Sequence, residues 1–133
     1  MTALRRRLAC ERGDALIEGL FALALVLLTV AIGAQALAYA HARSVATAAA
    51  QDGARAAAAA GPEAGVTRAN AILDAAGGAG AHLRASAQEA SDEVTVSVKG
   101  EAPRLFSLPL LMPAVQASAS LPLERYSAEE AAP

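Results

Sequence analysis

The sequence has no tryptophan, and its two tyrosines and two phenylalanines make aromatic residues only 3% of 133 positions. Such a chain is a poor platform for stacking sugar rings or nucleic-acid bases, and it favours close helix packing over a large aromatic core. Cysteine is almost absent as well, since Cys10 is the only one. An intramolecular disulfide and a four-cysteine metal site are therefore both excluded.

The motifs that most often carry catalysis are also missing. The sequence has no glycine loop followed by lysine for binding phosphate, no Gly-x-Ser-x-Gly turn and no cluster of metal ligands. The glycine-rich segment 77–80 follows a predicted helix rather than a strand and indicates a flexible connector. His41 and His82 lie far apart along the chain. We therefore expect no enzyme activity, no catalytic residue, no metal, no cofactor and no small-molecule substrate.

What the sequence has instead is an abundance of apolar residues, which make up 55% of the chain. They concentrate in an uncharged run over residues 19–40, and an alanine-rich segment without proline continues this run to Ala60. Gly61 and Pro62 then stop it. In a helix, about 20 residues rising 1.5 Å each cover the roughly 30 Å hydrocarbon layer of a bilayer. The sequence thus predicts a transmembrane and spine helix over residues 14–60.

Basic residues concentrate before this helix, in a predicted leader peptide over residues 1–13. Four of the eleven basic residues lie there beside a single acid, Glu11, and Arg43 alone closely follows the apolar run. Arginines that flank one end of a membrane helix hold that end in the cytoplasm, so the C-terminal part is predicted to lie outside. Seven basic and twelve acidic residues remain after residue 13, a balance that excludes nucleic acid as a partner. The residues that set this topology are Arg5, Arg6, Arg7 and Arg12.

Two pairs of small residues, spaced four positions apart, lie within the apolar helix. Ala15 with Gly19, and Thr29 with Gly33, each provide a face on which another helix can approach closely. Either pair taken alone also fits the general abundance of small residues in such helices. Beyond the membrane, a narrow polar stripe leaves a wide face for packing against the rest of the domain and against other helices. The stripe consists of Arg43, Thr47, Gln51 and Arg55.

Residues 61–126 are predicted to form a small α+β domain outside the membrane. Apolar residues recur at helical spacing over residues 63–76, which indicates a second helix. Apolar and polar residues then alternate over 83–88 and 94–99, a pattern typical of two strands in a hairpin. A third alternation over 115–123 completes a three-stranded antiparallel sheet.

Two segments of this region have no regular pattern. The apolar segment 103–113 is too short, and too often interrupted by proline, to cross a membrane. We expect a covering loop or a short helical turn whose leucine and phenylalanine side chains pack on the sheet or on the first helix. The alternative is an exposed apolar lip that docks a neighbour. Residues 127–133 are predicted to form a disordered tail.

Glu18 is a carboxylate one turn inside the apolar helix. A charged side chain at the bilayer centre costs roughly 2.5–3.5 kcal/mol, and less toward the edge, where it can snorkel and benefit from the positive end of the helix. Together with Gly13 and Asp14, Glu18 resembles the processing site of type IV prepilins, in which a short basic leader ends in glycine and a glutamate follows five residues later. In that family, prepilin peptidase cuts after the glycine on the cytoplasmic side.

Further segments of the sequence resemble one particular branch of the type IV pilins. The segment 12–18, the leucine-rich run and the segment 48–57 are similar to the TadE-like family, whose members are minor pilins or pseudopilins of the tight-adherence (Tad/Flp) branch of type IV pili. The strand 94–98 and the ending 123–126 also resemble this family, so the similarity covers most of the chain.

The resemblance implies a structural role for the protein. Prepilin peptidase would cut between Gly13 and Asp14, and Glu18 would pair with the new amino terminus of a neighbouring subunit. A free ammonium group neutralises a carboxylate that would otherwise be buried as an unpaired charge. The implied partners are the membrane, prepilin peptidase and other pilin and pilus-assembly subunits. The implied location is the cytoplasmic membrane, with incorporation into a surface pilus.

Two other interpretations of the apolar helix stay open at the level of sequence. In the first, the helix is an uncleaved single-pass anchor that holds a binding module or an assembly scaffold in the cell envelope. In the second, signal peptidase cuts near Ala36 and releases a secreted protein, because Ala34-Gln35-Ala36 has the small residues of such a cleavage site. The mass of the mature protein separates these three outcomes.

Overall fold

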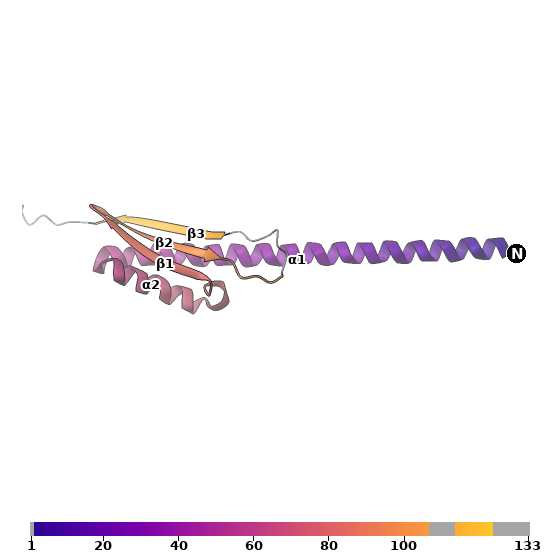
Figure 1. The fold of residues 1–133 in the computed structure, drawn as a ribbon, viewed down its shortest axis with the longest axis horizontal. Helices are drawn as coiled ribbons and strands as arrows, with labels where there is room; N and C mark the ends of the chain where they lie inside the picture. The colour runs from indigo at the N-terminus through magenta and orange to yellow at the C-terminus, as the bar shows by residue number, and fades with distance from the viewer. Residues whose placement is uncertain (1, 107–113, 124–133) are drawn as a thin grey trace, which may run out of the picture. The chain divides into compact units, whose positions relative to one another are not determined.

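The structure, a computed structural model, describes residues 2–106 and 114–123, and for residues 2–13 it describes the backbone alone. It is an α+β fold with two helices, a short 3-10 turn and one sheet (Figure 1), as the sequence predicts. The elements in chain order are α1 (Thr2–Ala60), α2 (Pro62–Ala75), η1 (Gly77–Ala79), β1 (Leu83–Ala90), β2 (Glu93–Glu101) and β3 (Ala114–Pro122). The chain divides into two compact units, Met1–Ala36 and Leu37–Pro133, each of which is described by itself below.

The helix α1 is continuous from Thr2 to Ala60. The predicted helix begins at residue 14, but in the structure the helix also includes most of the predicted leader peptide and runs through Gly13 without a break. One glycine costs a helix only about 1 kcal/mol, and the alanine, leucine and arginine residues around it favour the helical state. At the other end, Gly61 has a φ of 93°, which a residue with a side chain rarely adopts, and its N–H donates to the carbonyl of Ala57 at 2.8 Å.

The unit Met1–Ala36 presents an apolar surface to its surroundings. Every side chain from residue 14 to residue 30 is exposed, including Leu16 at 75% and Phe21 at 73%. The segment Asp14–Ala60 contains a stretch that is long and apolar enough to cross a membrane by length and composition, and none of that stretch is buried by the rest of the chain. The length and exposure of this stretch are compatible with a single-pass membrane anchor.

In the unit Leu37–Pro133, β1, β2 and β3 form an antiparallel sheet in that order, which confirms the predicted hairpin and third strand. The register places Ala87 opposite Val96, and Val96 opposite Ala119, so the apolar positions of all three strands share one face. This face covers the C-terminal part of α1, with α2 alongside (Figure 1). The fully buried residues of the resulting core include Ala42, Ala46, Ala49, Ala54, Val94, Val96, Val98 and Val115.

The connecting segments differ in detail from the predictions. The glycine-rich segment that we expected to be a flexible connector forms η1, where the N–H of Gly80 donates to the carbonyl of Gly77 at 2.9 Å. Leu105 and Phe106 are both exposed, which leaves the start of the predicted covering loop at the surface. The rest of that loop, residues 107–113, and the predicted disordered tail, 127–133, lie outside the described residues.

Candidate functional site

The carboxylates of the predicted processing site lie at the start of the apolar surface. Asp14 and Glu18 are four residues apart on α1, and both side chains are exposed. Residues four apart on a helix lie on the same face, so both carboxylates face the same side of α1. Gly13 lies within the same helix, as do Arg5, Arg6, Arg7 and Arg12, whose side chains lie outside the described part of the chain. Cleavage after Gly13 and the topology set by the arginines stay predictions.

The two pairs of small residues lie at the surface of α1. Ala15, Gly19, Thr29 and Gly33 are all exposed, and a methyl group added at either glycine would have no atom within 4 Å. The hydroxyl of Thr29 donates to the carbonyl of Leu25 at 2.8 Å, so its hydrogen-bonding need is met within the helix. Both pairs therefore offer shallow notches without unsatisfied polar groups, as close helix approach requires.

The second half of α1 uses small residues in the same way, against α2. A Cβ added at Gly65 would lie 2.5 Å from the Cβ of Ala57 and 2.8 Å from the carbonyl oxygen of Gly53. A Cβ added at Gly53 would lie 3.0 Å from the Cβ of Ala69. The spacing of four between Gly53 and Ala57 is repeated between Gly65 and Ala69. This repeat of small residues is present in the sequence and is the signal from which the contact between α1 and α2 could have been predicted.

Asp52 joins the two helices at the edge of this contact. Its carboxylate accepts a hydrogen bond from Arg55 of α1 at 2.6 Å and forms an ion pair with Arg68 of α2 at 3.5 Å. The pair with Arg55 follows from the i,i+3 spacing within one helix, whereas the pair with Arg68 joins two helices. The side chains of Asp52 and Arg68 are 39% and 57% exposed, so water screens the pair. Exposed ion pairs of this kind contribute about 0.2–1 kcal/mol.

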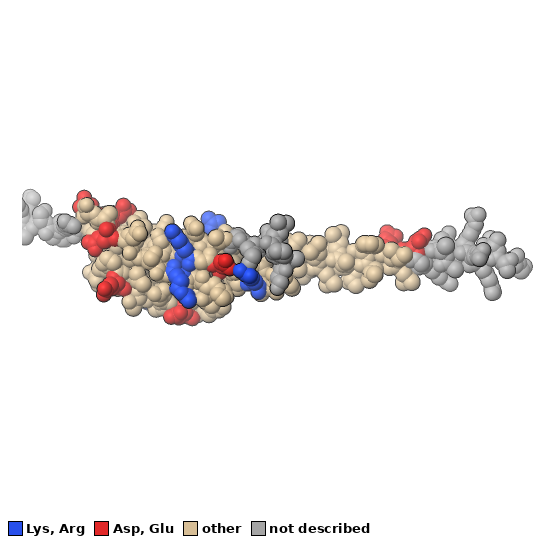
Figure 2. All heavy atoms as spheres, in the orientation of Figure 1, with Lys and Arg blue, Asp and Glu red and all other residues tan. Residues whose placement is uncertain are grey.

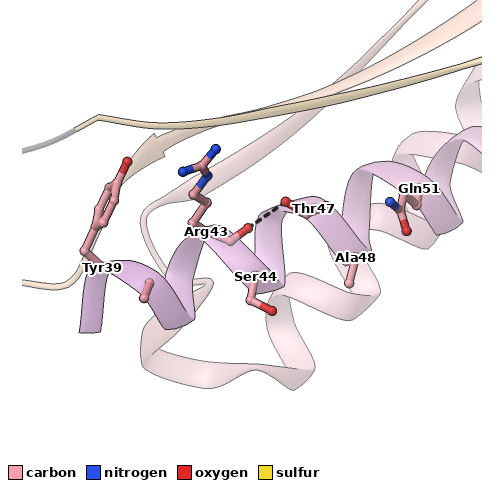
Figure 3. Close-up of a pocket in the computed structure, with 7 residues that line it drawn as sticks. Tyr39, Arg43, Ser44, Thr47, Ala48 and Gln51 are labelled. Atoms are coloured by element: carbon pink, nitrogen blue, oxygen red, sulfur yellow. Dashed lines mark hydrogen bonds between the residues drawn. The ribbon is translucent and has the colours of Figure 1, made fainter. Parts of the chain in front are cut away.

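The predicted polar stripe is exposed along α1, at Arg43, Thr47, Gln51 and Arg55. Part of it lines an open hollow of about 540 Å³, where the hydroxyl of Thr47 donates to the carbonyl of Arg43 at 2.9 Å (Figure 3). Tyr39 and Arg43 project to the same side of the helix in this view. The described residues that line the hollow all come from α1 and are Tyr39, Ala40, Arg43, Ser44, Thr47, Ala48 and Gln51.

The side chains on these surfaces suit contacts with lipid and with other helices. Within residues 2–106 and 114–123, no group of three or more histidine, cysteine, aspartate or glutamate side chains is placed to hold a metal ion. His82 lines a separate hollow with Glu101 and Arg104, far along the chain from His41. The features that the structure brings to the surface are apolar side chains, small notches and single charges, which suit contact with lipid and with other helices.

The chain was compared with protein-family models, curated proteins and solved structures, and no match was found in any of them. The segments 12–18 and 48–57 are among those in which this sequence resembles TadE-like proteins. The structure adds a physical role to the second of these, since Asp52, Gly53 and Ala57 form the contact between α1 and α2.

Proposed function

We propose that this protein is a minor pilin-like (pseudopilin) structural subunit of a Tad-type type IV pilus or a related secretion apparatus. The observation that carries this proposal is the division of α1, a single helix with two different surfaces. Its side chains from residue 14 to residue 30 are exposed and mostly apolar, whereas Ala42, Ala46 and Ala49 are fully buried in the domain core. A helix built in this way can rest in lipid and later exchange lipid for neighbouring helices.

The amino-terminal end of α1 provides the assembly chemistry in this proposal. Prepilin peptidase cleaves after Gly13 on the cytoplasmic side, where the arginines of the leader hold the chain. The new α-ammonium group of Asp14 then lies one turn from Glu18 of the same chain and is available to Glu18 of a neighbour. Pairing across subunits neutralises both charges, which sets the axial register of the packed helices. The notches at Gly19 and Gly33 let these helices approach closely.

The experiment that tests the proposal is intact mass measurement with N-terminal sequencing of the protein purified from its native membrane. We expect a chain that begins at Asp14 and lacks residues 1–13. The matched control is a variant with Gly13→Leu, which we expect to keep its leader, because a bulky side chain replaces the glycine of the cleavage site. A wild-type chain that begins at Met1 or Thr2, in a cell with active prepilin peptidase, would contradict the proposal.

A second candidate function is supported by the continuity of α1 across Gly13. An uncleaved single-pass anchor needs no accessible peptide bond at that point, and its outer domain would act as a binding or assembly scaffold in the envelope. The same mass measurement separates the candidates, since the anchor keeps its leader. A secreted protein released near Ala36 would instead lack the whole apolar surface, and its mass would be lower still.

A further inference from the structure

The solvent face of the sheet carries opposite charges at its two ends. Arg84 of β1 and Lys99 of β2 are directly opposite each other in the register, and we call them the cationic pair. At the other end, the β1–β2 hairpin carries Asp92 and Glu93, which we call the acidic tip. All four side chains are exposed. Figure 2 shows acidic side chains gathered at the hairpin end of this face and basic side chains away from it.

The cationic pair has no carboxylate partner among the described residues. The guanidinium of Arg84 donates to backbone carbonyls, those of Leu83 at 2.8 Å and Ala81 at 3.3 Å. Glu101 is the acid nearest to Lys99 along β2, and it is already paired with Arg104 at 2.8 Å. Like charges directly opposite on neighbouring strands destabilise a sheet, so Arg84 and Lys99 carry a cost that an external carboxylate would offset.

The surface between the cationic pair and the acidic tip is neutral, and apart from Gln88 and Gln116 its side chains are small. Ser97 lies opposite Ser86 on one side and Ser118 on the other, and the hydroxyls of Thr95 and Ser120 are 2.9 Å apart. Beside Lys99, the residues Ser97, Lys99, Gln116, Ala117 and Ser118 line a hollow of about 310 Å³. A neighbouring protein can therefore approach this face without displacing a large apolar side chain or an unpaired acid.

We propose that this face docks a second copy of the chain, with Asp92 and Glu93 of one copy against Arg84 and Lys99 of the next. Charge complementarity within one surface favours a second copy as the occupant, because the chain carries both halves of the contact. Such a contact is head-to-tail, so each copy keeps a free cationic pair or a free acidic tip at its outer end.

The parallel orientation of the two copies rests on the proposed function, in which neighbouring chains insert in the same membrane and point the same way. The pair Arg84–Lys99 and the pair Ala90–Glu93 are separated by six residues of β1. At about 3.3 Å per residue, neighbouring copies are then offset by roughly 20 Å along the strands. The contact would add an axial register outside the membrane to the one that Glu18 sets within it.

The test is disulfide cross-linking of full-length chains in the membrane, in a background that carries Cys10→Ser. One chain carries Ser97→Cys beside the cationic pair, and a co-expressed chain carries Ser91→Cys at the acidic tip. We expect a mixed dimer to form under mild oxidation. The control is Thr67→Cys, an exposed position on α2, which we expect to give no mixed dimer with Ser97→Cys.

Charge exchange makes the test specific for the ionic contact. Arg84→Glu with Lys99→Glu in the first chain is expected to lower the yield of mixed dimer by about two- to thirtyfold, as the loss of two exposed ion pairs implies. Asp92→Lys with Glu93→Lys in the second chain should then restore it. A yield that charge reversal leaves unchanged would overturn the proposal. A homotypic Ser97→Cys dimer as abundant as the mixed one would also overturn it, since that places two sheet centres together.

The cross-linking test of the docking contact and the mass test of the proposed function can fail independently of each other. A chain that begins at Asp14 but gives no mixed dimer rejects the docking contact and leaves the pilin assignment intact. A chain that keeps its leader and gives the mixed dimer rejects the pilin assignment and leaves the docking contact intact.

Discussion

Gly65 lies where α1 and α2 pack too closely to leave room for a side chain. The space that a side chain would need is occupied by Ala57 and by the carbonyl oxygen of Gly53. An alanine-rich core can bury little area per residue, so close backbone approach is the means by which these helices gain van der Waals contact. The fit at Gly65 is therefore expected to matter more than the identity of any single alanine around it.

We predict that Gly65→Ala destabilises the domain. The added methyl group forces α1 and α2 apart, and overpacking of this kind costs about 1–3 kcal/mol, less the small gain in helix propensity. Differential scanning calorimetry of the full chain in detergent should show Tm lower by about 4–8 °C per kcal/mol. The control is Gly78→Ala, where a new methyl group has no atom within 4 Å and Tm should change little. Equal Tm values for both variants would contradict this account of the interface.

At the scale of single residues, the sequence predicts those motifs and side-chain pairs whose members lie close together along the chain. The cleavage motif and the pair Asp52–Arg55 are both local, and the structure contains the latter. Arg68 was missed as a partner of Asp52 because the turn at Gly61 and the packing of α2 bring it within reach. That geometry is tertiary, so no spacing rule for one helix gives it.

At the scale of elements, periodicity predicted all three strands, the second helix and the end of the first helix to within a few residues. The alternation of β2 is confirmed, since Val94, Val96 and Val98 are fully buried while the residues between them are partly accessible. The start of α1 was not predicted, because helix propensity outweighs the single Gly13. The turn η1 was not predicted either, since a run of glycines has no side-chain pattern to read.

We predict that Val96→Ala and Ser97→Ala have very different effects, although they are neighbours in β2. Val96 is fully buried, and its Cγ1 atom lies 3.1 Å from the position that a Cβ on Gly53 would take. Removing two buried methyl groups should lower the free energy of unfolding by about 2 kcal/mol. Ser97 faces solvent, and its replacement should stay within about 0.5 kcal/mol of wild type. Native-state hydrogen exchange of β2 amides measures both, and similar protection in the two variants would refute the assigned strand register.

At the scale of the whole molecule, α1 has to serve two environments with one continuous element. Its exposed apolar surface is compatible with contact to lipid or other helices, while its alanine face packs against the sheet and α2. The sequence predicts this division from composition alone, since leucine dominates the first part and alanine the second. It does not predict which surfaces meet a neighbour, because the charges and small residues of such a surface are brought together only by the tertiary fold.

Substitution of Glu18 tests the assembly proposal at the scale of the whole molecule. We predict that Glu18→Gln leaves cleavage and membrane insertion intact, because the amide removes a charge from the apolar helix and makes insertion less costly. In the packed helices, however, the ammonium group of a neighbour would lose its partner, at a cost of about 3–5 kcal/mol for a buried ion pair broken on one side.

Electron microscopy of cells carrying Glu18→Gln should therefore show surface pili reduced by more than about a hundredfold if this contact limits assembly. Membrane fractions from the same cells should contain the chain beginning at Asp14 in normal amount. Asp14→Glu serves as the matched control, because it changes a neighbouring carboxylate on the same face without removing its charge, and it should preserve piliation. Normal piliation in Glu18→Gln cells would remove Glu18 from the mechanism. Loss of pili in both variants would instead place the defect in processing at the site around Gly13, which the mass of the membrane-bound chain would reveal.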